Sequence, residues 1–311
     1  MIAPLRRPLA AGIVTLVAIV GCGADPAATT STTPASTTSI PDSTSSTAPA
    51  TTTTPDPVST TSRGEVGDLL VVGDWGTGTL PQGAVAGGMM AHAEGEPVEA
   101  IVTTGDNFYS DDWEFLMHPY GWAAESGIPF WISWGNHDVE TASRIEAINT
   151  AFDNPPRWAV HQWGRADVII VDSTQVDSTE QTEFLTETLA GGDRPTIVVM
   201  HHPPFSCGSH GDSPAVVDEW VPLWDDDVIL VLSGHEHNYQ RFERDQIPYV
   251  VSGGGGQTLT ELTECVGGHP PRVDGEAVHH FLVLEQNGSS VSVSAVDVNG
   301  NPIDEFEVAL P

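Results

Sequence analysis

The sequence lacks lysine altogether, so arginine supplies all of its basic side chains. Only 10 basic residues stand against 43 acidic ones, and the formal net charge is −33. A surface of this sign repels nucleic acid and anionic lipid headgroups, which argues against nonspecific binding to either. We therefore expect no nucleic-acid partner, and we interpret most of the charge as a solvated surface.

Long hydrophobic runs are also missing. The apolar stretch at residues 9–20 is too short to span a bilayer comfortably, but it follows Arg6 and Arg7 and precedes small residues, as in a secretory signal. Its end, IVGC, resembles a bacterial lipobox. We predict a lipoprotein signal peptide over residues 1–21 and attachment through a lipidated Cys22 to the outer face of a bacterial cytoplasmic membrane. The alternatives are an ordinary signal peptide with secretion, or an uncleaved anchor.

Cysteine is scarce as well, and the three cysteines are Cys22, Cys207 and Cys265. They are too few for a structural zinc site of four thiolates. In an exported protein whose Cys22 carries lipid, the other two remain as an even pair in an oxidising compartment. This favours a disulfide between Cys207 and Cys265, and the alternative is two separate buried thiols.

Residues 22–64 contain few large apolar side chains and are dominated by Thr, Ser, Pro and Ala. Such a segment buries too little apolar surface to offset the entropy that ordering would cost. We predict a Ser/Thr/Pro-rich disordered tether over 22–64, followed by one catalytic domain over residues 65–311.

Short runs of β-branched and aromatic residues recur along this domain. Most are almost continuously apolar, as expected of strands that are buried on both faces. The runs are 68–72, 100–103, 129–134, 168–171, 196–200 and 228–232, with helical patterns at 143–150 and 180–189. The C-terminal part instead suggests antiparallel strands at 281–284, 291–296 and 303–308. This order predicts one layered α/β domain with sheets inside and helices outside.

Polar clusters follow five of these runs at the points where the runs end. The clusters are GDWG with Asp74, GDNFY with Asp106 and Tyr109, GNHD with Asn136 and His137, HHPP with His201 and His202, and GHEH with His235 and His237. Ligands of open α/β sheets bind beyond the carboxyl ends of the strands, so the clusters should meet in space. Each turn alone is ordinary loop sequence, whereas the five together predict a metal site.

The donor atoms of these clusters are carboxylates, an amide oxygen and imidazoles, with no thiolate. Such a set suits Fe, Mn or Zn in a hydrolytic centre. It offers more ligands than one tetrahedral ion can take, so we predict two metal ions that share a bridging carboxylate.

Taken in this order, the motifs resemble those of the metallophosphoesterases, and more narrowly those of the purple acid phosphatases of the small type related to tartrate-resistant acid phosphatase. The resemblance covers roughly residues 68–256. It implies a four-layer α/β/β/α sandwich of two mixed sheets flanked by helices. It also implies an acid phosphatase that hydrolyses small phosphate monoesters by attack of a metal-activated hydroxide on phosphorus. A phosphodiesterase or nucleotidase of the wider superfamily is the alternative, and a lipoprotein that binds a ligand without catalysis is a third interpretation.

The resemblance also implies a role for each residue of the motifs. Fe(III) would be held by Asp74, Asp106, Tyr109 and His237, and Fe(II), Zn or Mn by Asp106, Asn136, His201 and His235. Asp106 would bridge the two ions. In HHPP the spacing from the strand favours His201 as the ligand, and His202 is then interpreted as a neighbour with a structural hydrogen bond.

Two further histidines are candidates for contact with the substrate. His137 of GNHD would face the phosphate, and the alternative is a supporting residue oriented by Asp138. His210 lies nine residues after His201, at an offset where small family members carry a histidine that can protonate the leaving oxygen. Both donate only when protonated, which favours an acidic pH optimum.

Overall fold

The computed structural model describes residues 66–224, 227–265 and 270–311. The predicted signal peptide, the lipid-bearing Cys22 and the tether lie outside these residues and stay predictions. Within the described ranges, no helix combines the length and apolar character needed to cross a membrane.

A mixed sheet of six strands, sheet A, opens and closes the domain. Its three parallel strands are β1 (Asp68–Val72), β2 (Val98–Thr103) and β3 (Phe130–Trp131). Its three antiparallel strands are β11 (His280–Asn287), β12 (Ser290–Asp297) and β13 (Pro302–Ala309). Strand β11 pairs with β1, so the order across the sheet is β13-β12-β11-β1-β2-β3.

A second mixed sheet of seven strands, sheet B, contains the middle of the chain. Its strands are β4 (Ala159–Trp163), β5 (Ala166–Ile170), β6 (Thr196–Val199), β7 (Val228–Ser233), β8 (Tyr239–Arg244), β9 (Ile247–Ser252) and β10 (Arg272–Glu276). The order is β10-β8-β9-β7-β6-β5-β4. Strands β5, β6, β7 and β9 are parallel, and β4, β8 and β10 are antiparallel to their neighbours.

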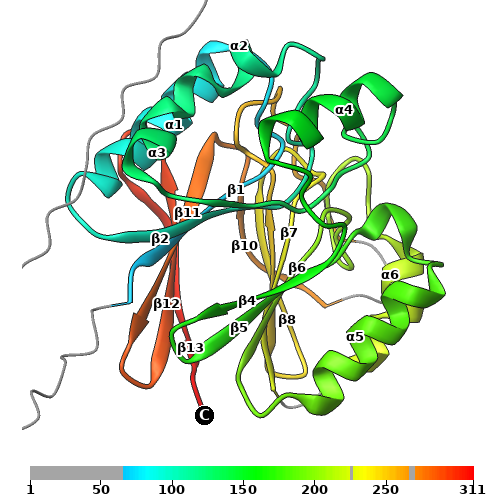
Figure 1. Cartoon of the computed structure of the whole chain (residues 1–311). Coiled ribbons are helices and arrows are strands. Elements are labelled where there is room, and N and C mark those ends of the chain that lie inside the picture. Colours follow the sequence, from blue (N-terminus) through cyan, green and yellow to red (C-terminus); the bar gives the residue numbers. More distant parts are fainter. Residues whose placement is uncertain (1–65, 225–226, 266–269) are drawn as a thin grey trace, which may run out of the picture. The chain divides into compact units, whose positions relative to one another are not determined.

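Helices cover the outer face of each sheet (Figure 1). On sheet A these are α1 (Leu80–Ala93), α2 (Trp113–Met117), α3 (Gly121–Ser126) and α4 (Ala142–Ala151), and on sheet B they are α5 (Thr179–Gly191) and α6 (Pro214–Glu219). Helix α5 begins at Ser178, whose hydroxyl accepts a hydrogen bond from the backbone N–H of Gln181. Helix α4 begins in the same way at Thr141, whose hydroxyl accepts from the backbone N–H of Arg144. Each hydroxyl gives a partner to an N–H that has none within its helix.

Successive side chains of a strand point to opposite faces of the sheet, so the side chains of β1 enter two different cores. Leu69 and Val71 join the core between the two sheets, whereas Leu70 and Val72 join the core between sheet A and its helices. In sheet B, Val198 and Val231 face α5 and α6 in a third core. Three cores separate four layers, and the predicted α/β/β/α sandwich of two mixed sheets is confirmed.

Several elements were not predicted, and local sequence explains why. Helix α1 contains Gly83, Gly87 and Gly88, which lower helix propensity and hide its pattern. Gly88 is required by packing, because a Cβ there would lie 2.9 Å from the ring of Phe281. Strands β4, β8 and β10 carry charged or polar residues among the apolar ones, so they lack the continuous runs that marked the central strands, and β9 contains Pro248, which is rare inside a sheet.

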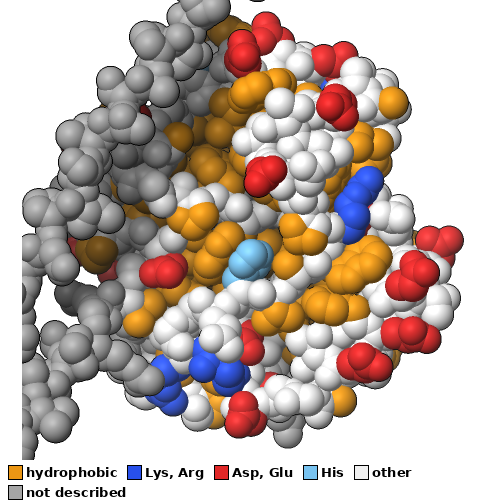
Figure 2. Space-filling model, in the orientation of Figure 1, with side chains coloured by type: hydrophobic (Ala, Val, Ile, Leu, Met, Phe, Trp, Pro, Cys, Tyr) orange, Lys and Arg blue, Asp and Glu red, His pale blue; other side chains and the backbone are white. Residues whose placement is uncertain are grey.

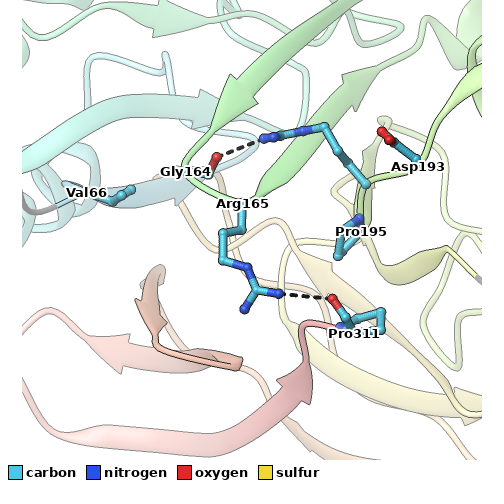
Figure 3. Close-up of a pocket in the computed structure, with 7 residues that line it drawn as sticks. Val66, Gly164, Arg165, Asp193, Pro195 and Pro311 are labelled. Carbon is cyan, nitrogen blue, oxygen red and sulfur yellow. Dashed lines mark hydrogen bonds between the residues drawn. The ribbon is translucent and has the colours of Figure 1, made fainter. Parts of the chain in front are cut away.

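Two surface features lie away from the motifs. Acidic side chains are spread along α5, and arginines are few on the same face (Figure 2). A shallow hollow is lined by residues that precede β1 and β6, by the β4–β5 turn and by the C-terminal Pro311 (Figure 3). It therefore lies at the amino ends of β1, β5 and β6, and we call it the amino-end pocket.

Candidate metal centre

Five loops carry the predicted ligands, and each begins where a parallel strand ends. Strands β1, β2 and β3 lead into Asp74, Asp106 and Asn136, and β6 and β7 lead into His201 and His235. Hydrogen bonds between the loops show that these ends meet. The backbone N–H of His235 donates to Asp74 Oδ2 at 2.9 Å, and that of His137 donates to Asp106 Oδ1 at 2.8 Å.

One group of side chains surrounds the phenol oxygen of Tyr109. Tyr109 Oη lies 3.2 Å from Asp74 Oδ1, 3.1 Å from Asp106 Oδ2 and 3.4 Å from His237 Nε2. His237 Nδ1 lies 2.8 Å from the carbonyl oxygen of Thr258 and donates to it, so the lone pair of the ring is on Nε2. These four side chains are those that the resemblance assigns to the first metal.

A second group surrounds Nε2 of His201. This atom lies 3.0 Å from Asn136 Oδ1, 3.2 Å from His235 Nδ1 and 3.4 Å from Asp106 Oδ1. His201 Nδ1 donates to the carbonyl oxygen of Thr104 at 2.9 Å, which again leaves the lone pair on Nε2. Asp106 has one oxygen in each group, as a bridging carboxylate requires. All seven predicted ligands therefore meet, in the two groups that the resemblance implies.

Three of these residues hold unusual backbone conformations. Asp74, Asp106 and His235 each follow a glycine and have φ values of 55°, 48° and 71°. The left-handed region disfavours side chains with a Cβ, and such residues persist where the surroundings hold them. This backbone conformation directs each side chain from the end of its strand toward the centre. The sequence marked the glycines of these turns, and the structure shows that the ligands also have positive φ values, in the second turn together with Gly105.

The atoms that face one another in the centre are mostly hydrogen-bond acceptors. Nε2 of His201 and the Asn136 oxygen are both acceptors, and so is each carboxylate oxygen of Asp106. Asp74 and Asp106 are almost fully buried, and among the described residues their ion pairs are with His237 and His201, not with an arginine. Buried acceptors converge here with few donors, chiefly the Tyr109 hydroxyl and the backbone N–H groups of His137 and His235, which favours a bound cation, so the residues fit a metal centre.

The pKa values of the centre also favour a bound cation. Burial, helped by the charges of Asp74 and Asp138, raises the pKa of Asp106 well above its ordinary value. Burial and the two carboxylates also raise the pKa of Tyr109. Burial and the neighbouring imidazoles lower the pKa of His235 to about 3. Burial therefore favours the neutral forms of Asp106, Tyr109 and His235, and bound cations would take the place of the protons on Asp106 and Tyr109.

Three histidines outside the two groups surround the centre. His137 is held through Nδ1 by Glu140 Oε2 at 3.2 Å, and His210 through Nδ1 by Glu236 Oε1 at 3.3 Å. His202 is held through Nδ1 by Ser173 Oγ at 2.9 Å. The interpretation of His137 as oriented by Asp138 is wrong. Asp138 instead accepts from the backbone N–H groups of Asn107, Phe108 and Gly135, and so fixes the two loops together.

Glu236 and the disulfide build the loop of His210, and sequence reasoning missed the first of them. Glu236 is fully buried and accepts from the backbone N–H groups of His210 and Gly211 and from the Thr260 hydroxyl. Its position inside GHEH was visible, but only the structure shows which loop it meets. Cys207 and Cys265 are joined by a disulfide, so the alternative of two separate thiols is wrong.

The aromatic residues near the motifs pack and do not form a substrate platform. Trp75 and Trp134 are fully buried, and the Trp75 ring makes an edge contact with Tyr120 at 4.7 Å between centroids. The glycine run at 253–256 is buried against the first motif, since the backbone N–H of Gly255 donates to the carbonyl oxygen of Gly73 at 2.9 Å.

The curated proteins similar to this chain include purple acid phosphatases of Arabidopsis thaliana. Purple acid phosphatase 17 is 28% identical over 60% of this chain and 67% of its own length. Purple acid phosphatase 7 is 26% identical over 60% of this chain and 69% of its own length. The chain thus spans about two thirds of the length of these relatives, which are distant homologues.

Solved structures share the fold at lower identity. A purple acid phosphatase from yellow lupin seeds superposes with a TM-score of 0.68 at 18% identity, covering 78% of this chain and 54% of the lupin chain. GAP50, the anchor in the inner membrane complex of Plasmodium, superposes with a TM-score of 0.67 at 20% identity, covering 79% and 90% of the two chains. Residues 68–239 match the family described as calcineurin-like phosphoesterase, which is more than half of the chain. The protein belongs to the calcineurin-like phosphoesterase family and is a metallophosphoesterase with a buried site of aspartates and histidines.

Proposed function

We propose that this metallophosphoesterase is a dinuclear acid phosphatase that hydrolyses small phosphate monoesters. The observation that carries the proposal is the position of Tyr109, whose phenol oxygen lies 3.2 Å from Asp74, 3.1 Å from Asp106 and 3.4 Å from His237. An aspartate at the end of β2 fits any member of the family. The tyrosine three residues later is the feature that the chain shares with the purple acid phosphatases it resembles.

The proposed metals are Fe(III) beside Tyr109 and His237, and Fe(II), Zn or Mn beside Asn136, His201 and His235. When bound, two such ions supply positive charge for the phosphoryl oxygens and lower the pKa of water. The chain itself holds the ligand atoms in place before any ion binds, because backbone donors and carbonyl oxygens fix the carboxylates and imidazoles.

His137 and His210 are the proposed proton donors to the substrate. Each is anchored at Nδ1 by an acid, Glu140 or Glu236, so its Nε2 is left for a phosphoryl or leaving-group oxygen. The His137 ring lies 4.7 Å from the ring of Tyr109, and the His210 ring lies 4.6 Å from that of His235. Two protonated imidazoles beside the centre favour catalysis at acidic pH.

A phosphodiesterase is the second candidate, because part of the chain also resembles one. A probable cyclic nucleotide phosphodiesterase of Synechococcus is 29% identical over 37% of this chain and 49% of its own length. Comparing kcat/KM for a simple phosphate monoester and a bis-ester separates the two candidates. Faster turnover of the bis-ester would favour the diesterase.

Location is a separate proposal that depends on the first 22 residues alone. We propose export and attachment through lipid on Cys22, with the domain held away from the membrane by residues 22–64. Secretion after cleavage by an ordinary signal peptidase is the alternative, and mass spectrometry of the mature N-terminus distinguishes the two.

The test of the proposed centre is the visible spectrum of the purified protein before and after Tyr109→Phe. A phenolate on ferric iron gives a charge-transfer band, so the wild-type protein should be coloured and the variant should lose that band while elemental analysis still finds metal. Tyr239→Phe is the matched control, since its hydroxyl donates to Asp304 at 2.8 Å, away from the centre. A band that persists unchanged in Tyr109→Phe would remove the phosphatase-type centre and leave only the broader metallophosphoesterase.

A further inference from the structure

The three histidines around the metal centre that are not predicted ligands share one arrangement. His137 and His202 are hydrogen-bonded through Nδ1 to Glu140 and Ser173, and Nδ1 of His210 forms an ion pair with Glu236. Among the described residues, these hydrogen-bond and ion-pair partners all contact Nδ1 and not Nε2. The resemblance accounts for His137 and His210 only, so His202 has an unassigned role at the same site.

His202 lies directly beside the second group of ligands. Its ring centroid is 4.6 Å from that of His235 and 4.9 Å from that of His201. One of its ring nitrogens lies within 4.8 Å of ring nitrogens of both neighbours. Its side chain is half-buried, so it borders the space above the centre and is not sealed in the core. The His210 ring lies at the same distance from His235, 4.6 Å between centroids, but the His210 side chain is exposed.

Ser173 decides which nitrogen of His202 carries the proton. Ser173 lies just after β5 and is almost fully buried, and its Oγ accepts from the backbone N–H groups of His201 at 3.2 Å and His202 at 2.8 Å. Two donors occupy the lone pairs of the hydroxyl, so its own hydrogen remains to be donated. Among the described residues, the acceptor in reach is Nδ1 of His202 at 2.9 Å. A neutral imidazole that accepts at Nδ1 carries its hydrogen on Nε2.

We propose that His202 is a third substrate-binding imidazole, which donates a hydrogen bond from Nε2–H to a non-bridging oxygen of the substrate phosphoryl group. The same tautomer argues against His202 as a metal ligand, because a ligand needs a lone pair where this ring has a hydrogen. His201 has the opposite tautomer, with Nδ1 bound to the Thr104 carbonyl oxygen. Of the two adjacent histidines of HHPP, His201 would thus bind the metal and His202 would bind the phosphoryl group. This inference rests on the proposed phosphoesterase function.

Two substitutions of His202 separate its nitrogens. In His202→Asn the amide occupies the place of Nδ1 and nothing replaces Nε2, whereas in His202→Gln the amide nitrogen reaches the place of Nε2. We expect His202→Asn to raise the inhibition constant of inorganic phosphate and the KM for a monoester roughly tenfold, with kcat within about threefold. His202→Gln should recover most of the loss. His161→Asn is the control, because that ring stacks on Trp131 in β3 and should leave both constants unchanged.

Metal content and the tautomer provide readouts that do not depend on turnover. His202→Asn should retain as much metal per chain as the wild type. In nitrogen-15 spectra of the metal-free full chain, His202 should show its hydrogen on Nε2. Loss of metal from His202→Asn, a hydrogen on Nδ1, or an unchanged phosphate inhibition constant would each overturn the proposal. If wild-type protein is neither inhibited by phosphate nor active on phosphoesters, the proposed function has failed instead, and the tautomer still tests the Ser173 step.

Discussion

The two ends of the same strands differ in how their polar groups are satisfied. Beside the amino-end pocket, Arg194 donates to the Asp167 carboxylate at 2.7 Å and to the carbonyl oxygens of Gly164 and Ala166. Arg165 donates to the carbonyl oxygens of Gly288 and Pro311. At the carboxyl ends, acceptors face acceptors, two buried acids have no arginine among the described residues, and three ligands hold left-handed φ angles.

Whether the polar groups already have partners distinguishes a structural site from a binding site better than the size of a pocket does. The amino-end pocket has cations that attract anions in principle, but carbonyl oxygens and a carboxylate already use their donors. The carboxyl-end centre has the opposite imbalance, since several of its acceptor atoms face other acceptor atoms. Buried polar groups without partners cost free energy, so a protein keeps them where a ligand will supply the partner.

The largest effect should come from Asp106→Asn at the carboxyl ends, and Asp167→Asn at the amino ends is its comparison. Asp106→Asn takes away the carboxylate shared by the two groups of ligands, so we expect loss of metal and a fall in kcat/KM of roughly a thousandfold or more. Asp167→Asn removes the carboxylate that pairs with Arg194 of the amino-end pocket and should leave kcat/KM within about twofold. Phosphatase assays and elemental analysis of both variants test the comparison. Equal losses of activity would show that the two ends do not differ as described.

A smaller effect should appear in the stability of the metal-free protein. The folded-state pKa of Asp106 is raised, so its contribution to stability is present below its ordinary pKa and is lost as pH rises through the raised value. The amide that Asp106→Asn introduces does not titrate in this range. We therefore expect chelator-treated Asp106→Asn to become more stable than chelator-treated wild type as pH rises from about 4 to 7, by about 1–3 kcal/mol at the upper end.

Denaturant unfolding of both proteins at several pH values measures this difference. Comparing the pair isolates Asp106, because the imidazoles of the centre titrate in both. Saturating metal should reverse the order, since the wild type alone has the complete centre. A metal-free variant that is less stable than wild type at neutral pH would mean that the carboxylate is not strained by its neighbours.

The sequence predicts the metal ligands better than it predicts the residues that hold the neighbouring histidines. The ligands Asp74, Asp106 and His235 could be predicted because each directly follows a buried strand, and strand ends of one sheet meet by construction. Ser173 and Glu236 could not, because each supports a histidine on a different loop. Which loops become neighbours depends on the packing of two sheets, and one sequence does not encode that distance in any local pattern.

The backbone conformations show the same limit. A glycine before Asp74 or Asp106 suggests a tight turn, but the sequence does not say which residue of the pair takes the positive φ. The structure gives the positive φ to Asp74 in the first pair and to both Gly105 and Asp106 in the second. Helix α1 was missed because its three glycines lower helix propensity, and of these only Gly88 packs closely against β11, at Phe281.

The smallest effect should come from Arg165→Ala at the amino-end pocket. Its guanidinium donates to Gly288 at 2.9 Å and to Pro311 at 3.0 Å, and both bonds are exposed to water, so their loss should cost about 0.5–1 kcal/mol of unfolding free energy without changing kcat/KM. Inorganic phosphate should also fail to raise the Tm of Asp106→Asn. This variant keeps Arg165 and Arg194 of the amino-end pocket, and both already have hydrogen-bond partners. Stabilisation of Asp106→Asn by phosphate, abolished by adding Arg165→Ala, would instead make the amino-end pocket an anion site. The contrast between the two ends would then be one of ligand sign, and not of satisfied against unsatisfied groups.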